Sequence, residues 1–150
     1  MTSELANARK KAMDLLASRE HGRAELLRKL GKAGFDSEIA ADAVDRLQDE
    51  GLQSDRRFVE NFVQSRIGQG KGPVRIRSEL GERGMSPGLV DEVIEEQAAD
   101  WHAMALEVRK RKFGPQRPSD FAEKARQMRF LQYRGFEPDQ IQDAVSAIED

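Results

Sequence analysis

The chain has 150 residues, of which 38% are hydrophobic, 35% are charged and 6% are aromatic. It contains no cysteine, which excludes disulfides, thiolate catalysis and zinc sites built on cysteine. No stretch approaches the roughly 18 apolar residues that a spanning helix needs, and the segment after Met1 lacks the apolar core of a secretory signal. We therefore expect a small cytoplasmic protein, helical rather than sheet-based, with a thin core and no contact with a membrane.

The net charge of −2 hides a segregation of charge along the chain. Residues 66–83 carry a net charge of +3 and residues 108–134 carry +7, whereas residues 86–107 between them carry −6. Segregated basic segments attract polyanions or acidic protein surfaces. An anionic partner is therefore compatible with the near-neutral total.

Three segments predict the same kind of helix end. In each, a leucine stands four residues before a glycine, and a large apolar residue follows the glycine. The three sets are Leu30, Gly34 and Phe35; Leu80, Gly84 and Met85; and Leu131, Gly135 and Phe136. Glycine accepts the left-handed conformation that ends a helix, and the next apolar side chain folds back onto the last turn. This recurrence indicates an internal repeat.

A further helix is predicted after each of these ends and another before it. Capping or first-turn groups for the helices that follow are supplied by Asp36, Ser86 and Pro138. Ser54 is the expected cap of the first helix of the second repeat. The repeats span residues 6–50, 52–98 and 100–149. We expect an all-α fold of three tandem three-helix repeats, stacked into an elongated, curved rod and present as a monomer.

The loops inside the repeats differ. The glycine-rich turn from Gly68 to Pro73 lacks the preceding strand and the lysine–hydroxyl ending of a phosphate-binding loop, so we interpret it as a connection between helices. Lys71 within it can still touch an anionic partner. Ser119 is the expected cap in the third repeat, and Gly22 is a weaker cap in the first.

Catalytic or metal chemistry is not indicated. His21 and His102 are too few and too far apart for a metal set, and we expect both to be surface or capping residues. No serine, histidine and carboxylate combination suggests a nucleophile, so we expect neither enzyme activity nor a cofactor. Five phenylalanines fit core positions, namely Phe35, Phe58, Phe62, Phe130 and Phe136. Phe113 and Tyr133 are the exceptions that could stack on a partner.

Basic residues recur in the second helix of each repeat, which argues against a purely solvating role. Arg23, Arg28, Lys29 and Lys32 lie in the first repeat, Arg75 and Arg77 in the second, and Lys124, Arg126, Arg129 and Arg134 in the third. The run Arg109-Lys110-Arg111-Lys112 precedes the last set. Acidic residues recur in the third helix of each repeat. The pattern predicts a basic ridge and an acidic ridge.

The sequence resembles the RecX family of regulatory proteins over nearly its whole length. The resemblance is carried by four segments: Ala12–Leu16 with Arg23–Leu30, Asp55–Phe58 with Arg66, Gly70–Leu80, and Lys124–Phe136. Gly22 departs from the family, which commonly has Ser or Thr there. The resemblance implies three three-helix repeats that dock along the groove of the RecA–single-stranded DNA filament. It also implies reduced filament extension, ATP hydrolysis, strand exchange and coprotease activity, and hence regulation of DNA repair, recombination and the SOS response.

The resemblance and the charge pattern together predict the residues that bind the filament. They are Arg66, Lys71, Arg75, Arg77, Lys124, Arg126, Arg129 and Arg134. The alternative is a direct DNA-binding protein, on single- or double-stranded DNA, built from units like helix-turn-helix modules. A third possibility, an enzyme that acts on nucleic acid, is not supported by any residues in the sequence.

Overall fold

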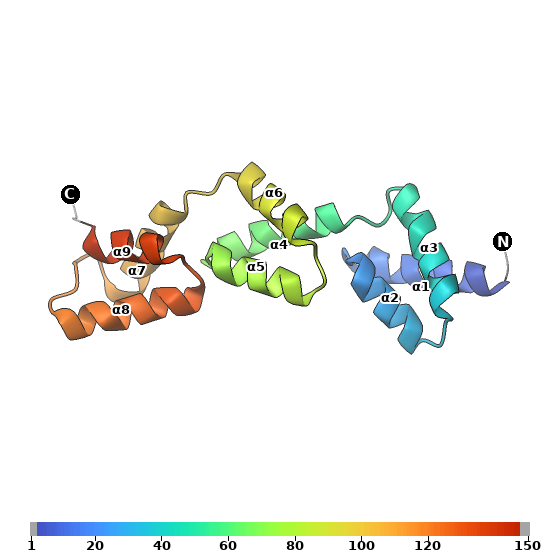
Figure 1. The fold of residues 1–150 in the computed structure, drawn as a ribbon, viewed down its shortest axis with the longest axis horizontal. Helices are drawn as coiled ribbons and strands as arrows, with labels where there is room; N and C mark the ends of the chain where they lie inside the picture. The colour runs from blue at the N-terminus through green and yellow to red at the C-terminus, as the bar shows by residue number, and fades with distance from the viewer. Residues whose placement is uncertain (1–2, 148–150) are drawn as a thin grey trace. The chain divides into compact units, whose positions relative to one another are not determined.

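A computed structural model describes residues 3–147, and this part of the chain consists of nine helices without a strand (Figure 1). The helices are α1 (Ser3–Ser18), α2 (Arg23–Lys32), α3 (Ser37–Asp49), α4 (Asp55–Gly68), α5 (Pro73–Glu82), α6 (Pro87–Gln97), α7 (Trp101–Phe113), α8 (Phe121–Arg134) and α9 (Pro138–Ser146). The all-α prediction is confirmed.

The chain divides into two compact units that do not coincide with the predicted repeats. One unit extends to Asn61 and includes Leu80–Val90, and the other contains Phe62–Glu79 and the chain from Asp91 onward. Helices α4, α5 and α6 are therefore each shared between the units. The boundaries 6–50, 52–98 and 100–149 stay a prediction, and residues 148 and 149 lie outside the described residues.

In the first unit, α1, α2 and α3 pack on one another around small and branched side chains. Leu26 and Leu30 of α2, together with Val44 and Leu47 of α3, are fully buried against Ala12 of α1. Alanine on α1 lets its backbone approach the other two helices closely. A thin core of this kind suits a chain in which charged residues are nearly as frequent as hydrophobic ones.

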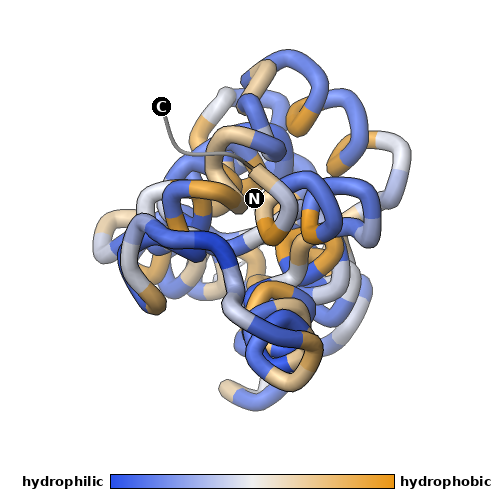
Figure 2. The backbone as a smooth tube through the Cα atoms, turned by 90° about the vertical axis from the view of Figure 1, so that its left-hand side faces the viewer, coloured by the Kyte–Doolittle hydropathy of each residue, from blue (hydrophilic) through white to orange (hydrophobic). Residues whose placement is uncertain are grey.

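In the second unit, α7, α8 and α9 make the corresponding three-helix packing. Its core comprises the buried residues Ala105, Leu131, Phe136, Ile141, Ala144 and Val145. Short hydrophobic stretches alternate with hydrophilic ones where the backbone can be followed in Figure 2. This is the pattern of amphipathic helices with one apolar stripe each. No helix within residues 3–147 is long and apolar enough to span a bilayer.

The three predicted glycine ends have the same hydrogen-bond geometry. Gly34, Gly84 and Gly135 have φ angles of 97°, 78° and 96°. The amide of the following residue donates back to the leucine carbonyl each time, at 3.1 Å from Phe35 to Leu30 and at 3.2 Å from Phe136 to Leu131. Met85 and Leu80 make the same bond at 3.1 Å. These bonds satisfy carbonyls that the last helical turn would leave unpaired.

Most of the predicted caps are confirmed. The carboxylate of Asp36 accepts from the Glu38 amide at 3.1 Å, and the hydroxyls of Ser54 and Ser86 accept from the amides three residues later. The prediction that Ser119 caps α8 is wrong, because Asp120 is the capping residue and accepts from the Glu123 amide at 2.8 Å. A carboxylate there also complements the positive end of the helix dipole.

The start of α2 is capped from a distant part of the sequence. Gly22 precedes the helix and has no side chain to cap it, as expected. The carboxylate of Asp55 instead accepts from the Arg23 amide at 2.7 Å. A Cβ at Gly22 would overlap the methyl group at the flexible end of the Met85 side chain, so a larger residue here requires Met85 to shift.

The prediction that His21 is a surface or capping residue is wrong. Only 1% of His21 is exposed. Its Nδ1 lies 3.0 Å from the Arg19 carbonyl oxygen, and its Nε2 lies 3.0 Å from the Lys29 ammonium. Both ring nitrogens therefore have a hydrogen-bond partner, which is what a buried imidazole requires. His102, by contrast, is exposed and contacts Asp139 and Asp143.

Candidate partner-binding surface

The eight predicted binding residues all lie in the second compact unit. Arg66 is in the last turn of α4, Lys71 in the turn after it, and Arg75 and Arg77 are in α5. Lys124, Arg126, Arg129 and Arg134 are in α8. The structure brings Arg66, Lys71, Arg75 and Arg134 together, and we call these four residues the basic cluster.

Glu79 holds two of these arginines in place. Its two carboxylate oxygens accept from Arg66 Nε at 2.7 Å and from Arg75 Nε at 3.2 Å. Burial alone would raise the pKa of Glu79, but the hydrogen bonds from Arg66 and Arg75 outweigh it and lower that pKa below its ordinary value. The Arg66 guanidinium also lies 4.1 Å from the centre of the Phe62 ring. Arg66 is thus largely committed to the fold.

Lys71 experiences the positive potential of its neighbours. Burial, and then the charges of Arg75 and Arg134, lower the pKa of the Lys71 ammonium. Arg134 is fixed beside it by a 2.9 Å hydrogen bond to the Gln69 carbonyl. The repulsion between these cations persists because the two arginines are anchored, and an anion bound between them would relieve it.

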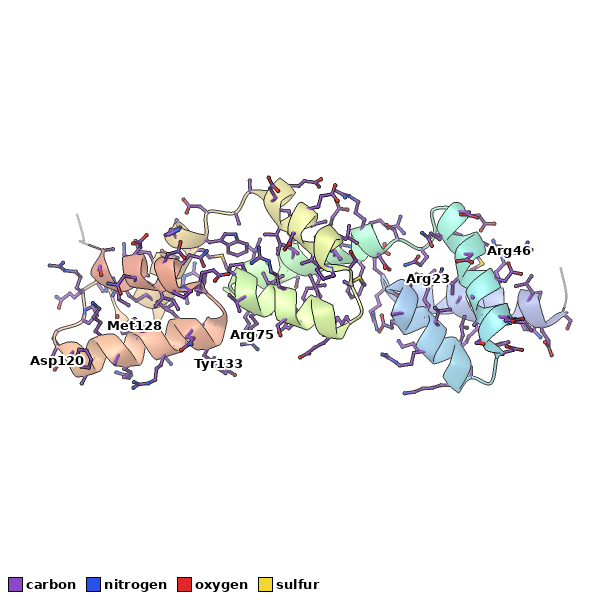
Figure 3. All side chains as sticks on the ribbon, in the orientation of Figure 1. Arg23, Arg46, Arg75, Asp120, Met128 and Tyr133 are labelled. Atoms are coloured by element: carbon purple, nitrogen blue, oxygen red, sulfur yellow. The ribbon has the colours of Figure 1, made fainter. Side chains whose placement is uncertain are left out.

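Arg75 lies against Tyr133 at the end of α8, as Figure 3 shows. Its guanidinium lies 5.2 Å from the centre of the tyrosine ring, and it donates to the Tyr133 carbonyl at 3.3 Å. Tyr133 nevertheless keeps 74% of its surface exposed. The structure therefore presents an aromatic ring beside the basic cluster, with most of its surface open to a partner.

Arg77 does not belong to the cluster. Its guanidinium lies 2.9 Å from Asp91 at Nε and 3.6 Å from Glu137 at Nη1. Two carboxylates offset its charge, so Arg77 offers less to an anionic partner than its place in the sequence predicted. The predicted segregation into a basic and an acidic ridge does not hold at this point.

The other three α8 residues lie nearer to the start of that helix. Arg126 is exposed, lies 5.1 Å from the Phe113 ring centre and pairs with Glu123 at 3.2 Å. Lys124 is half-buried beside Phe121, which is itself 86% exposed. Arg129 borders a hollow of about 740 Å³ between Val74, Met128 and Ile141. These cations are accessible and contribute little to the core.

The run of four basic residues at the end of α7 divides into two kinds. Arg109 is completely buried, and its guanidinium donates to the Gln116 carbonyl at 2.9 Å, which ties down the loop before α8. Its assignment to a basic surface is therefore wrong. Arg111 and Lys112 are exposed, and Lys112 lies 5.5 Å from the Phe130 ring centre.

Arg111 and Lys112 border a groove that the list of eight residues missed. The groove has a volume of about 240 Å³ and lies between the Gly68–Gly70 turn, the end of α7 and the end of α8. Its cations are Arg111, Lys112 and Arg134, and no carboxylate is among the described residues that line it. The basic run in the sequence was the available signal, but helical spacing alone did not distinguish the buried Arg109 from its exposed neighbours.

Within residues 3–147, no three histidine or carboxylate side chains gather into a group that could hold a metal ion. The arrangement that the second unit does show is a set of fixed cations interleaved with aromatic rings. Such a surface binds anions by charge and by stacking.

Comparison with known families assigns most of the chain. Residues 8–47 match the family described as "RecX, first three-helix domain", and residues 54–94 match the second three-helix domain. Residues 100–145 match the third.

Alignments of the chain with individual relatives agree with these matches. The chain is 50% identical over 133 residues to "Regulatory protein RecX" of Pseudomonas entomophila, an alignment that covers 89% of this chain and 86% of the relative. The protein of the same name from Halorhodospira halophila is 46% identical over 139 residues, covering 93% and 86%.

Solved structures show the same fold at low identity. The crystal structure of RecX from Lactobacillus salivarius superposes with a TM-score of 0.84 at 16% identity, covering 97% of this chain and 96% of the other. A second crystal structure of regulatory protein RecX gives a TM-score of 0.81 at 18% identity, covering 96% and 72%.

Proposed function

Because the chain belongs to the RecX family of regulatory proteins, we propose that it modulates RecA without chemistry of its own. It binds the groove of the RecA–single-stranded DNA filament in the cytoplasm. There it limits filament extension, ATP hydrolysis, strand exchange and coprotease activity. By this route it regulates recombination, DNA repair and the SOS response.

The accessible cations of α8 carry this proposal most directly. Lys124, Arg126 and Arg129 lie in the most basic block of the sequence and are not committed to the core. The basic cluster adds Lys71, Arg75 and Arg134 around the end of the same helix. Cations in a fixed arrangement attract acidic protein surface and DNA phosphates alike, and a RecA–DNA filament presents both.

Inhibition on this basis needs only binding. A protein that contacts adjacent protomers of a filament hinders their relative movement and the addition of further subunits. Slower protomer movement lowers the rate of DNA-dependent ATP hydrolysis. The roles of Arg66 and Arg77 within this surface are chiefly to hold it together, since both are paired with carboxylates.

A binding titration with and without RecA tests the proposal against direct DNA binding. Fluorescently labelled single-stranded DNA is titrated with the protein at about 150 mM salt, first naked and then coated with RecA in the presence of a slowly hydrolysed ATP analogue. We expect the filament to bind at least tenfold more tightly than naked DNA.

Equal affinity for naked and coated DNA would favour the direct DNA-binding alternative. Absence of binding to the filament would contradict the proposal. The salt concentration must be held constant, because the affinity of any protein for phosphates falls steeply with salt.

A further inference from the structure

Cations and an exposed aromatic ring lie together at the end of α8. Attraction of an acidic protein surface needs only the cations. Arg75 contacts Tyr133 from α5, and Arg134 and Lys112 lie 5.3 and 5.5 Å from the centre of the Phe130 ring. Cations and rings therefore alternate over a short stretch of surface.

The cations here have anchors that fix them in position. Arg134 donates to the Gln69 carbonyl, and Arg75 donates to Glu79 and to the Tyr133 carbonyl. The groove beside them holds Arg111, Lys112 and Arg134 at its walls and no carboxylate among the described residues that line it. Arg111 is paired with Glu107 at 3.1 Å, so Lys112 and Arg134 are the cations that favour an anionic group in this groove. Its volume of about 240 Å³ admits a group no larger than a few phosphates.

Tyr133 distinguishes between anionic partners. Its 74% exposure leaves most of the ring available, although Arg75 lies over part of it. An acidic protein loop would be held by the cations, and the ring would add only apolar contact to it. An unpaired base stacks on such a ring irrespective of its identity, while the phosphates that flank it bind the neighbouring cations. Bases in a duplex are already stacked and cannot reach the ring.

We propose that Tyr133, Lys71 and the groove between Lys112 and Arg134 form a binding site for single-stranded DNA. One base stacks on the exposed side of Tyr133, and the adjoining phosphates lie against Lys71 and in the groove. The site deepens the proposed function by assigning this part of the surface to the DNA strand rather than to RecA. It rests on charge and stacking, so it has little sequence preference.

The test measures binding of a fluorescent oligodeoxythymidine of about 20 nucleotides by anisotropy at several salt concentrations. Tyr133→Leu removes the ring but keeps an apolar side chain, and we expect binding about tenfold weaker. Tyr133→Phe keeps the ring and should bind like the unaltered protein. Lys112→Glu should make the binding constant less dependent on salt: the magnitude of the slope of its logarithm against the logarithm of the salt concentration should fall by about one to two.

Lys11→Glu is the matched control, since Lys11 is exposed on α1 and the change in charge is identical. It should leave binding nearly unaltered. A duplex of the same length is the second control, and Tyr133→Leu should have no effect on whatever affinity it shows. Wild-type affinity of both Tyr133→Leu and Lys112→Glu for the oligonucleotide would overturn the proposal.

A second measurement uses the assembled complex. DNA carrying 5-iododeoxyuridine is coated with RecA, bound by the protein and irradiated, and crosslinked peptides are identified by mass spectrometry. A crosslink to the peptide that contains Tyr133 supports the site even if naked DNA binds weakly. Absence of this crosslink, together with unaltered affinities of the variants, overturns the proposed site. If the variants lose filament binding without any crosslink, this surface contacts RecA, so the proposed function stands and the DNA site does not.

Discussion

The amide of Gly72 donates to the carbonyl oxygen of Arg134 at 2.8 Å, so that α5 begins where α8 ends. The next amide available in α5, that of Val74, donates to the Gly135 carbonyl at 2.9 Å. Amides at a helix start and carbonyls at a helix end are the groups that a helix leaves unpaired. The unpaired amides at the start of α5 therefore bond to the unpaired carbonyls at the end of α8. This contact places Lys71 and Arg75 beside Arg134.

Gly135→Ala tests this contact. The φ of 96° is unfavourable for alanine, and a methyl group would overlap the backbone and Cβ of Arg75. We expect a loss of about 3 kcal/mol or more, because strain and overlap act together. Gly34→Ala is the control, with a φ of 97° but nothing within 4 Å of the added methyl group. It should cost only about 1 kcal/mol in urea unfolding. Equal losses would show that the contact contributes nothing.

Asp55→Ala should destabilise the first compact unit. Its carboxylate caps α2 by accepting from the Arg23 amide and also accepts from the Gln53 side chain at 3.0 Å. Removal of a cap costs about 1 kcal/mol, and thermal melts would detect it. Gly22→Ser, which adds a side chain able to cap α2, should not stabilise the protein, since it would displace the Met85 side chain. Stabilisation by Gly22→Ser would contradict this account of the α2 start.

Glu79→Gln should destabilise the protein in a pH-dependent way. The pKa of Glu79 is lowered in the folded protein, so the carboxylate stabilises the fold at pH 7 and above its unfolded pKa of about 4.3. The contribution is lost as pH falls through the lower, folded-state pKa. We expect a difference of about 1–2 kcal/mol between variant and unaltered protein at pH 7 that shrinks between pH 5 and pH 3. A difference independent of pH would rule out ionic pairing as its cause.

Ala98→Gly should stabilise the protein. Ala98 is the one non-glycine residue with a positive φ, 47°, within residues 3–147, and it follows the end of α6. Glycine relieves the left-handed strain, as Gly34, Gly84 and Gly135 do after α2, α5 and α8, for a gain of about 0.5–1 kcal/mol. A raised melting temperature checks the prediction, and a lowered one would contradict it.

The local features of this fold could be predicted from the sequence because short-range contacts determine them. Leu30, Gly34 and Phe35 make their hydrogen bond within six residues, and so do the two equivalent sets, which is why one pattern identified all three helix ends. The caps at Asp36, Ser54 and Ser86 are equally local.

Features that depend on distant parts of the sequence were missed. Asp55 caps a helix that begins 32 residues earlier, and Gln53 donates to the carbonyl of the buried His21 across the same separation. Arg109 is buried because the loop around Gln116 folds over it, which composition cannot reveal. For the same reason the basic residues could be identified as a set, but their division into the paired Arg77 and the clustered Lys71 could not.

Reversal of charge at Lys124, Arg126 and Arg129 tests the central claim most directly, with inhibition of RecA's DNA-dependent ATPase as the measurement. We expect the triple glutamate variant to need at least about tenfold more protein for half-inhibition. Its melting temperature should be nearly unaltered, because charges at the protein surface contribute under about 1 kcal/mol each to folding. Reversal of Glu92, Glu95 and Glu96 on α6 to lysine is the control and should have a smaller effect. Equal impairment by both triples, or by neither, would contradict the claim that the basic surface of α8 restrains the filament.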